Sequence, residues 1–216
     1  MNINTKEYWD KRFLSGDWED KRGRRQTKQF AESQVHYFKI AHDFAGVILD
    51  FGCGLGDAMP VYRATYPNAS LIGIDISEAA IVRCREIYGD YATFIQGDHT
   101  KVPKVDVIIA SNVFEHLSND IEIAIQLLTK CKDLYIIVPY RENVNLGNEH
   151  IRSYDKHHFR GIGNYDFSIF FSKGWGSSGW KSWIDVYLKN ILRSLFGRKI
   201  VHASRQIMYH FATIEK

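Results

Sequence analysis

Short apolar runs recur between residues 46 and 140, separated by longer stretches with helical spacing. Runs of this length that are rich in Val, Ile and Leu are typical of buried strands. Their alternation with helices of about ten residues predicts a parallel sheet that carries helices on both faces. The predicted strands are 47–51, 71–75, 92–96, 105–111 and 134–139, and the predicted helices are 57–66, 77–88 and 121–129.

The pattern differs on either side of this core. Residues 29–44 have a loosely apolar helical face and follow a basic run from Lys21 to Lys28. After Pro139 the chain is polar and rich in His and Asn up to residue 164, which predicts a loop with at most one short helix. The remaining predicted elements are strands at 165–172 and 205–214 and an amphipathic helix at 180–196.

The composition is that of a globular chain with one domain. Its 216 residues are 45% hydrophobic and 25% charged, which excludes disordered and collagen-like classes. A formal net charge of +3 is too small to indicate nucleic-acid binding by itself. The three cysteines form no CxxC pair, the first residues have no signal-peptide pattern, and no apolar window is long enough to span a membrane. We therefore expect a cytoplasmic protein without a transmembrane segment.

One glycine-rich turn is the most informative segment. Residues 50–57 (DFGCGLGD) follow a predicted strand and open a predicted helix, the context that a ligand-binding glycine turn requires. Glycine permits positive φ and close approach of a ligand to the backbone. Asp57 stands where the dinucleotide fingerprint needs Gly or Ala. The carboxylates of Asp50 and Asp57 would repel a pyrophosphate and favour a cationic ligand.

Residues 47–57 (VILDFGCGLGD) resemble the first motif of class I S-adenosylmethionine-dependent methyltransferases. Three later features match that family in order. Asp75 ends the second predicted strand, Gly97-Asp98-His99 follows the third, and residues 111–117 (SNVFEHL) follow the fourth. The last of these is similar to the EHL segment of many methyltransferases that act on small molecules. The resemblance covers roughly residues 45–140 and the closing strand pair.

The resemblance implies an α/β fold with a doubly wound, mostly parallel seven-stranded sheet of the Rossmann-like methyltransferase type. An antiparallel last strand and a helical lid belong to this expectation. The implied divisions of the single domain are a cap (1–45), a cofactor-binding core (46–139), a substrate lid (140–204) and a closing strand (205–214).

The implied cofactor is S-adenosylmethionine. In the family, an acidic residue at the position of Asp75 binds the ribose hydroxyls, and an Asp at the position of Asp98 meets the adenine amine. Structural roles remain open for Asp50, which could orient loop amides, for Asp98 as a turn former, and for Asn112 as a loop stabiliser. The implied cofactor-binding residues are Asp50, Gly52, Gly54, Gly56, Asp75, Ile76, Asp98, His99 and Asn112.

Two histidines are the candidate catalytic residues. Methyl transfer needs a nucleophile aligned with the methyl group, and a base when the nucleophile carries a proton. His116 follows the fourth predicted strand, and His150 begins a stretch that resembles the H-x-R-x-[YF] segment of these enzymes. The alternative for each is packing or a loop-holding role. No metal site is expected, since the histidines lack His-x-x-x-His spacing and a nearby paired carboxylate.

A small molecule is the expected methyl acceptor. Residues 111–114 read SNVF, without the Asn/Asp-Pro-Pro-Tyr/Phe stretch of enzymes that methylate nucleic-acid bases. The paired-glutamate loop of protein-arginine methyltransferases has no counterpart either, so nucleic acid is disfavoured as a partner. We expect methyl transfer to an oxygen or nitrogen of an anionic or sugar-linked metabolite. The alternative is a non-catalytic S-adenosylmethionine-binding partner or regulatory protein.

Two basic segments leave alternatives open. The run Lys21–Lys28 is either a solvated loop or a contact for an anionic substrate. The helix within residues 180–199 is a lid over the pocket, a dimer face or an interfacial membrane helix, because it combines aromatic and basic residues. We expect a monomer or a homodimer.

Overall fold

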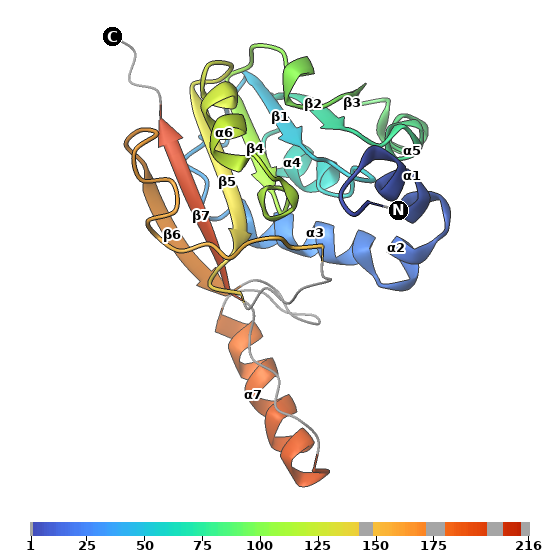
Figure 1. Cartoon of the computed structure of the whole chain (residues 1–216), viewed down its shortest axis with the longest axis vertical. Helices are drawn as coiled ribbons and strands as arrows, with labels where there is room; N and C mark the ends of the chain where they lie inside the picture. The colour runs from blue at the N-terminus through green and yellow to red at the C-terminus, as the bar shows by residue number, and fades with distance from the viewer. Residues whose placement is uncertain (1, 143–148, 172–179, 198–204, 213–216) are drawn as a thin grey trace.

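A seven-stranded sheet forms the centre of the protein (Figure 1). The computed structural model describes residues 2–142, 149–171, 180–197 and 205–212. The strand order is β3-β2-β1-β4-β5-β7-β6, in which β1 to β5 run parallel and β7 is antiparallel to both β5 and β6. The strands are β1 (Val47–Phe51), β2 (Ser70–Asp75), β3 (Ala92–Gln96), β4 (Val107–Ser111), β5 (Asp133–Pro139), β6 (Asp166–Phe171) and β7 (Arg205–Ala212).

All the predicted strands are present with bounds within two residues of those expected, and the doubly wound fold with its antiparallel last strand is confirmed. The prediction succeeds because the central strands β1, β4 and β5 are buried on both faces, which requires nearly continuous apolar runs. The chain passes from β1 to β2 and β3 on one side and returns to β4 and β5 on the other. The carboxyl ends of β1 and β4 therefore form the switch point where open α/β sheets bind ligands.

Helices cover both faces of the sheet. The helices α3 (Gly23–Gln34), α4 (Met59–Thr65) and α5 (Glu78–Tyr88) contribute buried side chains to one apolar cluster with the strands. The helix α6 (Asp120–Leu128) packs on the opposite face, together with the segment 149–165. The helices α4, α5 and α6 match predicted helices. Helix α5 begins at the N-cap residue Ser77, whose hydroxyl accepts the backbone N–H of Ala80 at 3.1 Å.

Three helices precede the sheet. α1 (Lys6–Leu14), α2 (Asp17–Asp20) and α3 lie across its carboxyl edge (Figure 1). The helix predicted at 29–44 is wrong in its bounds, because α3 ends at Gln34. Phe38 lies beyond it, in an irregular segment, with its ring 4.9 Å from that of Tyr135. Tertiary packing rather than helical spacing explains this apolar position. The basic run is not a loop either, since most of it lies in the first turns of α3.

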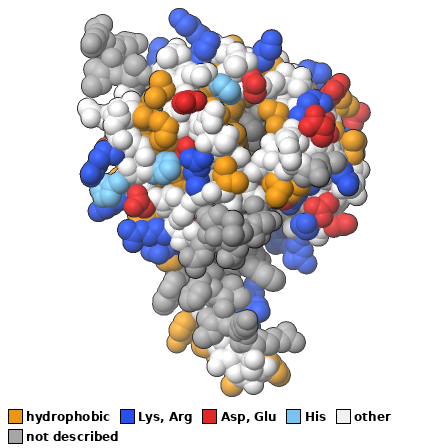
Figure 2. All heavy atoms as spheres, viewed as in Figure 1, with side chains coloured by type: hydrophobic (Ala, Val, Ile, Leu, Met, Phe, Trp, Pro, Cys, Tyr) orange, Lys and Arg blue, Asp and Glu red, His pale blue; other side chains and the backbone are white. Residues whose placement is uncertain are grey.

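The amphipathic helix α7 (Trp180–Leu195) is present as predicted, but it projects away from the sheet (Figures 1 and 2). The pocket at the carboxyl ends of β1, β2 and β4 is lined by no described side chain of α7, so the structure does not place this helix as a lid over it. Its exposed apolar residues are Ile184, Tyr187, Leu188, Ile191, Leu192 and Leu195. A dimer face and a membrane-surface contact remain predictions. Among the described helices, none is long and apolar enough to cross a bilayer.

Candidate functional site

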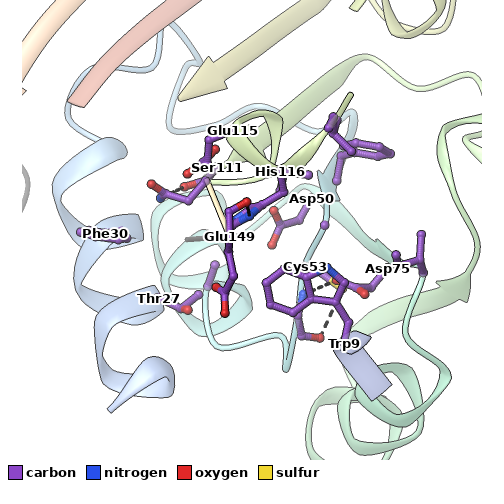
Figure 3. A pocket seen from close by; sticks show the side chains of 18 of the residues that line it. Trp9, Thr27, Phe30, Asp50, Cys53, Asp75, Ser111, Glu115, His116 and Glu149 are labelled. Atoms are coloured by element: carbon purple, nitrogen blue, oxygen red, sulfur yellow. Dashed lines mark hydrogen bonds between the residues drawn. The ribbon is translucent and has the colours of Figure 1, made fainter. Parts of the chain in front are cut away.

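A pocket of about 400 Å³ opens at the carboxyl ends of β1, β2 and β4 (Figure 3). Its walls come from the glycine turn after β1, the ends of β2 and β4, the helices α1 and α3, and residues near 150. Eight of the nine predicted cofactor residues and both candidate histidines line it. The predicted cap segment contributes Trp9, Phe13 and Phe30.

The glycine turn has the backbone conformation that its sequence predicts. Gly52 and Gly54 have φ of +75° and +51°. A Cβ on Gly52 would lie 2.3 Å from Val113 Cγ2, whereas one on Gly54 would reach only the ring of Phe13, at 3.6 Å. Gly54 therefore lets a ligand approach the backbone. Gly56 is not among the described pocket residues, and its positive φ and contact with Tyr88 give it a structural role.

Asp75 is held by two backbone amides. The N–H of Gly54 donates to Oδ2 at 2.8 Å, and the N–H of Ser77 donates to Oδ1 at 2.9 Å. Each carboxylate oxygen can accept a further bond, so a diol could donate one hydroxyl to each. Burial raises the pKa of Asp75 to about 6, although these two amides lower it. The carboxylate is thus fixed and desolvated before any ligand binds.

Asp50 is a second buried carboxylate at the base of the pocket, with 4% of its surface exposed. Burial, with a smaller contribution from the charge of Asp75, raises its pKa to about 7. A desolvated carboxylate favours a cation as its neighbour. The positive sulfonium of S-adenosylmethionine meets that requirement, whereas an additional anion would raise the cost of ionising Asp50.

Asp98 and Asn112 make the structural contacts that were considered as alternatives. Asp98 caps the 3₁₀ turn η1 (His99–Lys101), since its Oδ1 accepts the N–H of Thr100 at 2.9 Å and its hydroxyl at 2.6 Å. The hydrogen bond from the Thr100 hydroxyl is the main cause that lowers the pKa of Asp98. Asp98 and Asn112 also line the pocket, as do Ile76 and His99. A structural role and a ligand contact are therefore compatible here.

A polar network beneath Asn112 was not predicted from the sequence. The side-chain amide of buried Gln34 donates to Ser111 Oγ at 2.8 Å and to Gln206 Oε1 at 3.1 Å. Gln206 in turn donates to Asn112 Oδ1 at 2.8 Å. The network joins α3, β4 and β7, which are far apart in the chain. It fixes the loop after β4, where Asn112 has a left-handed φ of +55°.

Asp57 is the partner of Arg24, one residue of the basic run. Arg24 Nε and Nη2 donate to Asp57 Oδ1 at 3.0 Å and 2.9 Å, and the Tyr88 hydroxyl donates to the same oxygen at 2.9 Å. Arg24 thus anchors α3 to the segment between the glycine turn and α4. This residue is a structural partner of a buried carboxylate rather than a contact for an anionic substrate.

The second end of the pocket holds His116, in the 3₁₀ turn η2 (Phe114–His116). Its Nδ1 lies 3.2 Å from the carbonyl oxygen of Glu149, and its ring meets the rings of Trp9 and His150 edge-on. Burial lowers the pKa of His116 to about 3, with smaller contributions from the charges of His150 and Arg12. His116 is therefore neutral at physiological pH and a weak Brønsted base.

His150 has the opposite electrostatic environment. Its Nδ1 lies 2.5 Å from Glu142 Oε2, and this hydrogen bond is the main cause that raises the pKa of His150. The ring centroids of His150 and His116 are 4.9 Å apart. The structure therefore brings the two candidate histidines together, although they are 34 positions apart in the chain.

Glu115 completes this cluster and was not selected from the sequence as a site residue. Its side chain is 1% exposed, and neither carboxylate oxygen has a hydrogen-bond partner among the described residues. Burial raises its pKa to about 8. One ligand atom each from Glu115, His116 and His150 lies within 4.8 Å of the others. The EHL segment was the signal that could have identified Glu115, because it places this carboxyl group next to His116 in the chain.

The segment that carries His150 is anchored next to η2. Arg152 donates to Asp120 and to the carbonyl of Ser118, and the Tyr154 hydroxyl donates to the carbonyl of Phe114 at 2.8 Å. The N–H of Ile151 donates to the carbonyl of Glu115 at 2.9 Å. Arg152 and Tyr154 of the H-x-R-x-[YF] stretch thus hold the loop that positions His150.

Comparisons with known proteins agree with this geometry. Residues 49–134 match the model of the methyltransferase domain family. The malonyl-[acyl-carrier protein] O-methyltransferase of Neorickettsia risticii (strain Illinois) is 32% identical over 87 residues. This alignment covers 39% of the chain and only 35% of that relative, which is about a third of its length.

Solved structures show the same fold over nearly the whole chain. The plantazolicin methyltransferase BpumL, solved with S-adenosylhomocysteine, has a TM-score of 0.58 at 19% identity, covering 97% of this chain and 96% of its own. A putative methyltransferase in complex with the Haloferax volcanii activator Trm112 has a TM-score of 0.69 at 16% identity, covering 95% and 98%. An S-adenosylmethionine-dependent methyltransferase from Archaeoglobus fulgidus has a TM-score of 0.59 at 18% identity, covering 87% and 94%. At these identities the likeness shows the fold.

The fold is that of class I methyltransferases. Residues 49–134, which match the methyltransferase domain model, include the glycine turn, Asp75 and the η2 turn. The pocket suits the cofactor of the class, because it combines an open glycine turn with a preorganised carboxylate for hydroxyls and a buried carboxylate for a cation.

Proposed function

We propose that the protein transfers the methyl group of S-adenosylmethionine to an oxygen or nitrogen of a small molecule. One observation carries the proposal: a single pocket joins the glycine turn and Asp75 at one end to the cluster of Glu115, His116 and His150 at the other. The first end has the chemistry of the cofactor, and the second has polar groups suited to an acceptor. The cofactor supplies an activated methyl group, which passes to the acceptor in an in-line displacement.

The chain's own residues divide the work between the two ends. Asp75 would accept the ribose hydroxyls, and Asp50 would face the positively charged part of the cofactor. The rings of Trp9 and Phe13, contributed by α1, exclude water above the glycine turn. His150 is the better of the two proton acceptors, because Glu142 stabilises its charged form while burial disfavours the charged form of His116.

Calorimetric titration tests the cofactor part of the proposal. The protein is titrated with S-adenosylmethionine, S-adenosylhomocysteine and NAD, beside the variants Asp75→Ala and Asp90→Ala. Asp90 is exposed and outside the pocket, so it is the matched control. We expect both adenosyl ligands to bind, NAD not to bind, and Asp75→Ala to weaken binding roughly 100-fold, since it removes two charge-assisted hydrogen bonds.

Turnover is tested separately, by measuring S-adenosylhomocysteine released in the presence of hydroxyl- and amine-bearing metabolites. A double variant, His116→Gln with His150→Gln, should lose turnover while it keeps cofactor affinity. Cofactor binding with no turnover on any acceptor in wild-type protein would favour a binding or regulatory protein. Equal affinity in the wild type and Asp75→Ala would contradict the proposed cofactor site.

A further inference from the structure

The acceptor end of the pocket contains an arrangement that proton transfer alone does not explain. Glu115 is an almost completely buried carboxylate whose two oxygens lack hydrogen-bond partners among the described residues. It lines the pocket beside His116 (Figure 3). Buried polar groups are nearly always satisfied, and a buried carboxyl group ionises readily only where a cation or a hydrogen-bond donor lies beside it. Its oxygens therefore require a partner that the protein chain described here does not provide.

The two histidines next to Glu115 are both oriented through the same ring nitrogen. Nδ1 of His116 lies 3.2 Å from the backbone carbonyl of Glu149, and Nδ1 of His150 lies 2.5 Å from the carboxylate of Glu142. Each acceptor fixes the tautomer in which Nδ1 carries the proton, which leaves the Nε2 lone pair available. A histidine whose Nδ1–H is donated to a carbonyl or carboxylate is the usual state of a metal ligand.

The backbone holds these three side chains together. The N–H of Ile151 donates to the carbonyl of Glu115, and the Tyr154 hydroxyl donates to that of Phe114. The η2 turn and the segment after residue 149 are therefore fixed against each other next to the cluster. The nearby guanidinium of Arg12 is paired with Glu149, so it does not neutralise Glu115.

We propose that Glu115, His116 and His150 bind a divalent transition-metal ion at the acceptor end of the pocket. Two imidazole nitrogens and one carboxylate oxygen are ligands for Mn²⁺, Co²⁺, Fe²⁺ or Zn²⁺, whereas Mg²⁺ prefers oxygen ligands alone. The three ligand atoms lie within 4.8 Å of one another. Bonds of about 2.1 Å allow ligand atoms to be at most about 4.2 Å apart, so the side chains must close by roughly half an ångström.

The remaining coordination positions would face the pocket. Resting on the proposed methyl transfer, the ion would bind a hydroxyl oxygen of the acceptor and lower the pKa of that hydroxyl. Because His150 is then a ligand of the ion, the hydroxyl proton passes to solvent and not to this ring. The hydroxyl oxygen attacks the methyl carbon as the C–S bond breaks, and the electron pair of that bond stays on sulfur, giving a methyl ether and S-adenosylhomocysteine. This chemistry narrows the acceptor to one that carries a hydroxyl near a second oxygen atom, a pair that can chelate the ion.

Metal binding is measured without turnover. Full-length protein is freed of metal with a chelator, then titrated with Mn²⁺, Zn²⁺ and Mg²⁺ by calorimetry and with Co²⁺ by visible absorption, with and without S-adenosylhomocysteine. The variants are Glu115→Gln and His150→Gln, and the control is His157→Gln, an exposed histidine outside the pocket. S-adenosylhomocysteine affinity is measured for every protein, so failure of the cofactor site is seen separately.

We expect one equivalent of Mn²⁺, Co²⁺ or Zn²⁺ to bind wild-type protein and His157→Gln, with Mg²⁺ at least tenfold weaker. Both cluster variants should bind these ions 30-fold more weakly or worse while keeping their affinity for S-adenosylhomocysteine. The proposal would be overturned if these ions bound the cluster variants as tightly as wild-type protein. It would also be overturned if they did not bind wild-type protein in the presence of S-adenosylhomocysteine. If Glu115→Gln fails to fold, His150→Gln decides, because His150 lies on a loop and is only partly buried.

Discussion

At the scale of single residues, the site is defined by carboxyl groups whose pKa values are raised by burial. Asp50 and Asp75 lie near the carboxyl ends of two neighbouring strands, and burial raises the pKa of both. The sequence could predict that Asp50 and Asp75 share a sheet edge, since Asp75 ends one predicted strand and Asp50 is the next-to-last residue of another. It could not predict which oxygens would be satisfied by loop amides, because those amides come from residues whose positions depend on the whole fold.

Asp50→Asn should change how stability depends on pH. The ordinary pKa of this carboxyl is 3.8, and the folded value is about 7. Between these values the folded protein keeps a proton that the unfolded chain has lost, so the contribution of Asp50 to stability falls as pH rises from 4 to 7. The amide does not titrate. We expect the free energy of unfolding of the variant, relative to wild type, to rise by on the order of 1 kcal/mol per pH unit over this range.

Denaturant unfolding at pH 5, 6, 7 and 8, without cofactor, measures this difference. The exposed Asp90→Asn variant is the control, and its difference from wild type should change little with pH. A constant difference between Asp50→Asn and wild type across the four pH values would show that Asp50 is not desolvated in the folded protein.

At the scale of elements, the predictions succeeded for buried strands and failed where a long-range partner decides the structure. Strand β3 has the bounds that its sequence predicts, since a short apolar run between polar segments is typical of a strand. The helix predicted at 29–44 was misplaced, because Phe38 packs on β5 without being helical. For α7, the amphipathic pattern correctly predicts a helix but does not identify what its apolar face contacts.

The ion pair between Arg24 and Asp57 joins α3 to the segment after the glycine turn. Replacing Arg24 with Gln leaves Asp57, which is almost fully buried, with Tyr88 as its remaining side-chain partner among the contacts described. We expect Arg24→Gln to lower the free energy of unfolding by about 2 kcal/mol, which is the cost of leaving a buried carboxylate undersatisfied. Denaturant titration measures the loss. The neighbouring exposed residue gives the control Arg25→Gln, which should stay within about 0.5 kcal/mol of wild type; equal losses would show that the pair does not position α3.

At the scale of the whole molecule, the pocket is assembled from parts that are distant in the chain. The sheet edge supplies the glycine turn, the N-terminal helices supply the wall above it, and the segment after residue 149 brings His150 to η2. Class I folds place the cofactor end by topology, so motif spacing predicts its position from the sequence. The acceptor end depends on loops whose contacts are non-local, and for this reason Glu115 and Gln34 were not selected from the sequence.

Asp10 joins the N-terminal wall to the start of α5. Asp10 Oδ1, on α1, accepts the Ser77 hydroxyl at 2.6 Å and the N–H of Ala79 at 3.1 Å, at the start of α5. Ser77 also donates its N–H to Asp75. Asp10→Ala should therefore release α1 from the edge that holds Asp75 and weaken binding of S-adenosylhomocysteine about tenfold, equivalent to the loss of about 1.4 kcal/mol of hydrogen bonding.

Hydrogen exchange with and without S-adenosylhomocysteine follows the wall directly. In wild-type protein and in the exposed-site control Asp20→Ala, we expect ligand to slow exchange across α1, since Trp9 and Phe13 line the pocket. In Asp10→Ala this protection should be reduced at saturating ligand, while exchange in the buried strands stays as slow as in wild type. Full protection of α1 in the variant would mean that the aromatic contacts alone hold the wall, because they would then close the pocket without the link to α5.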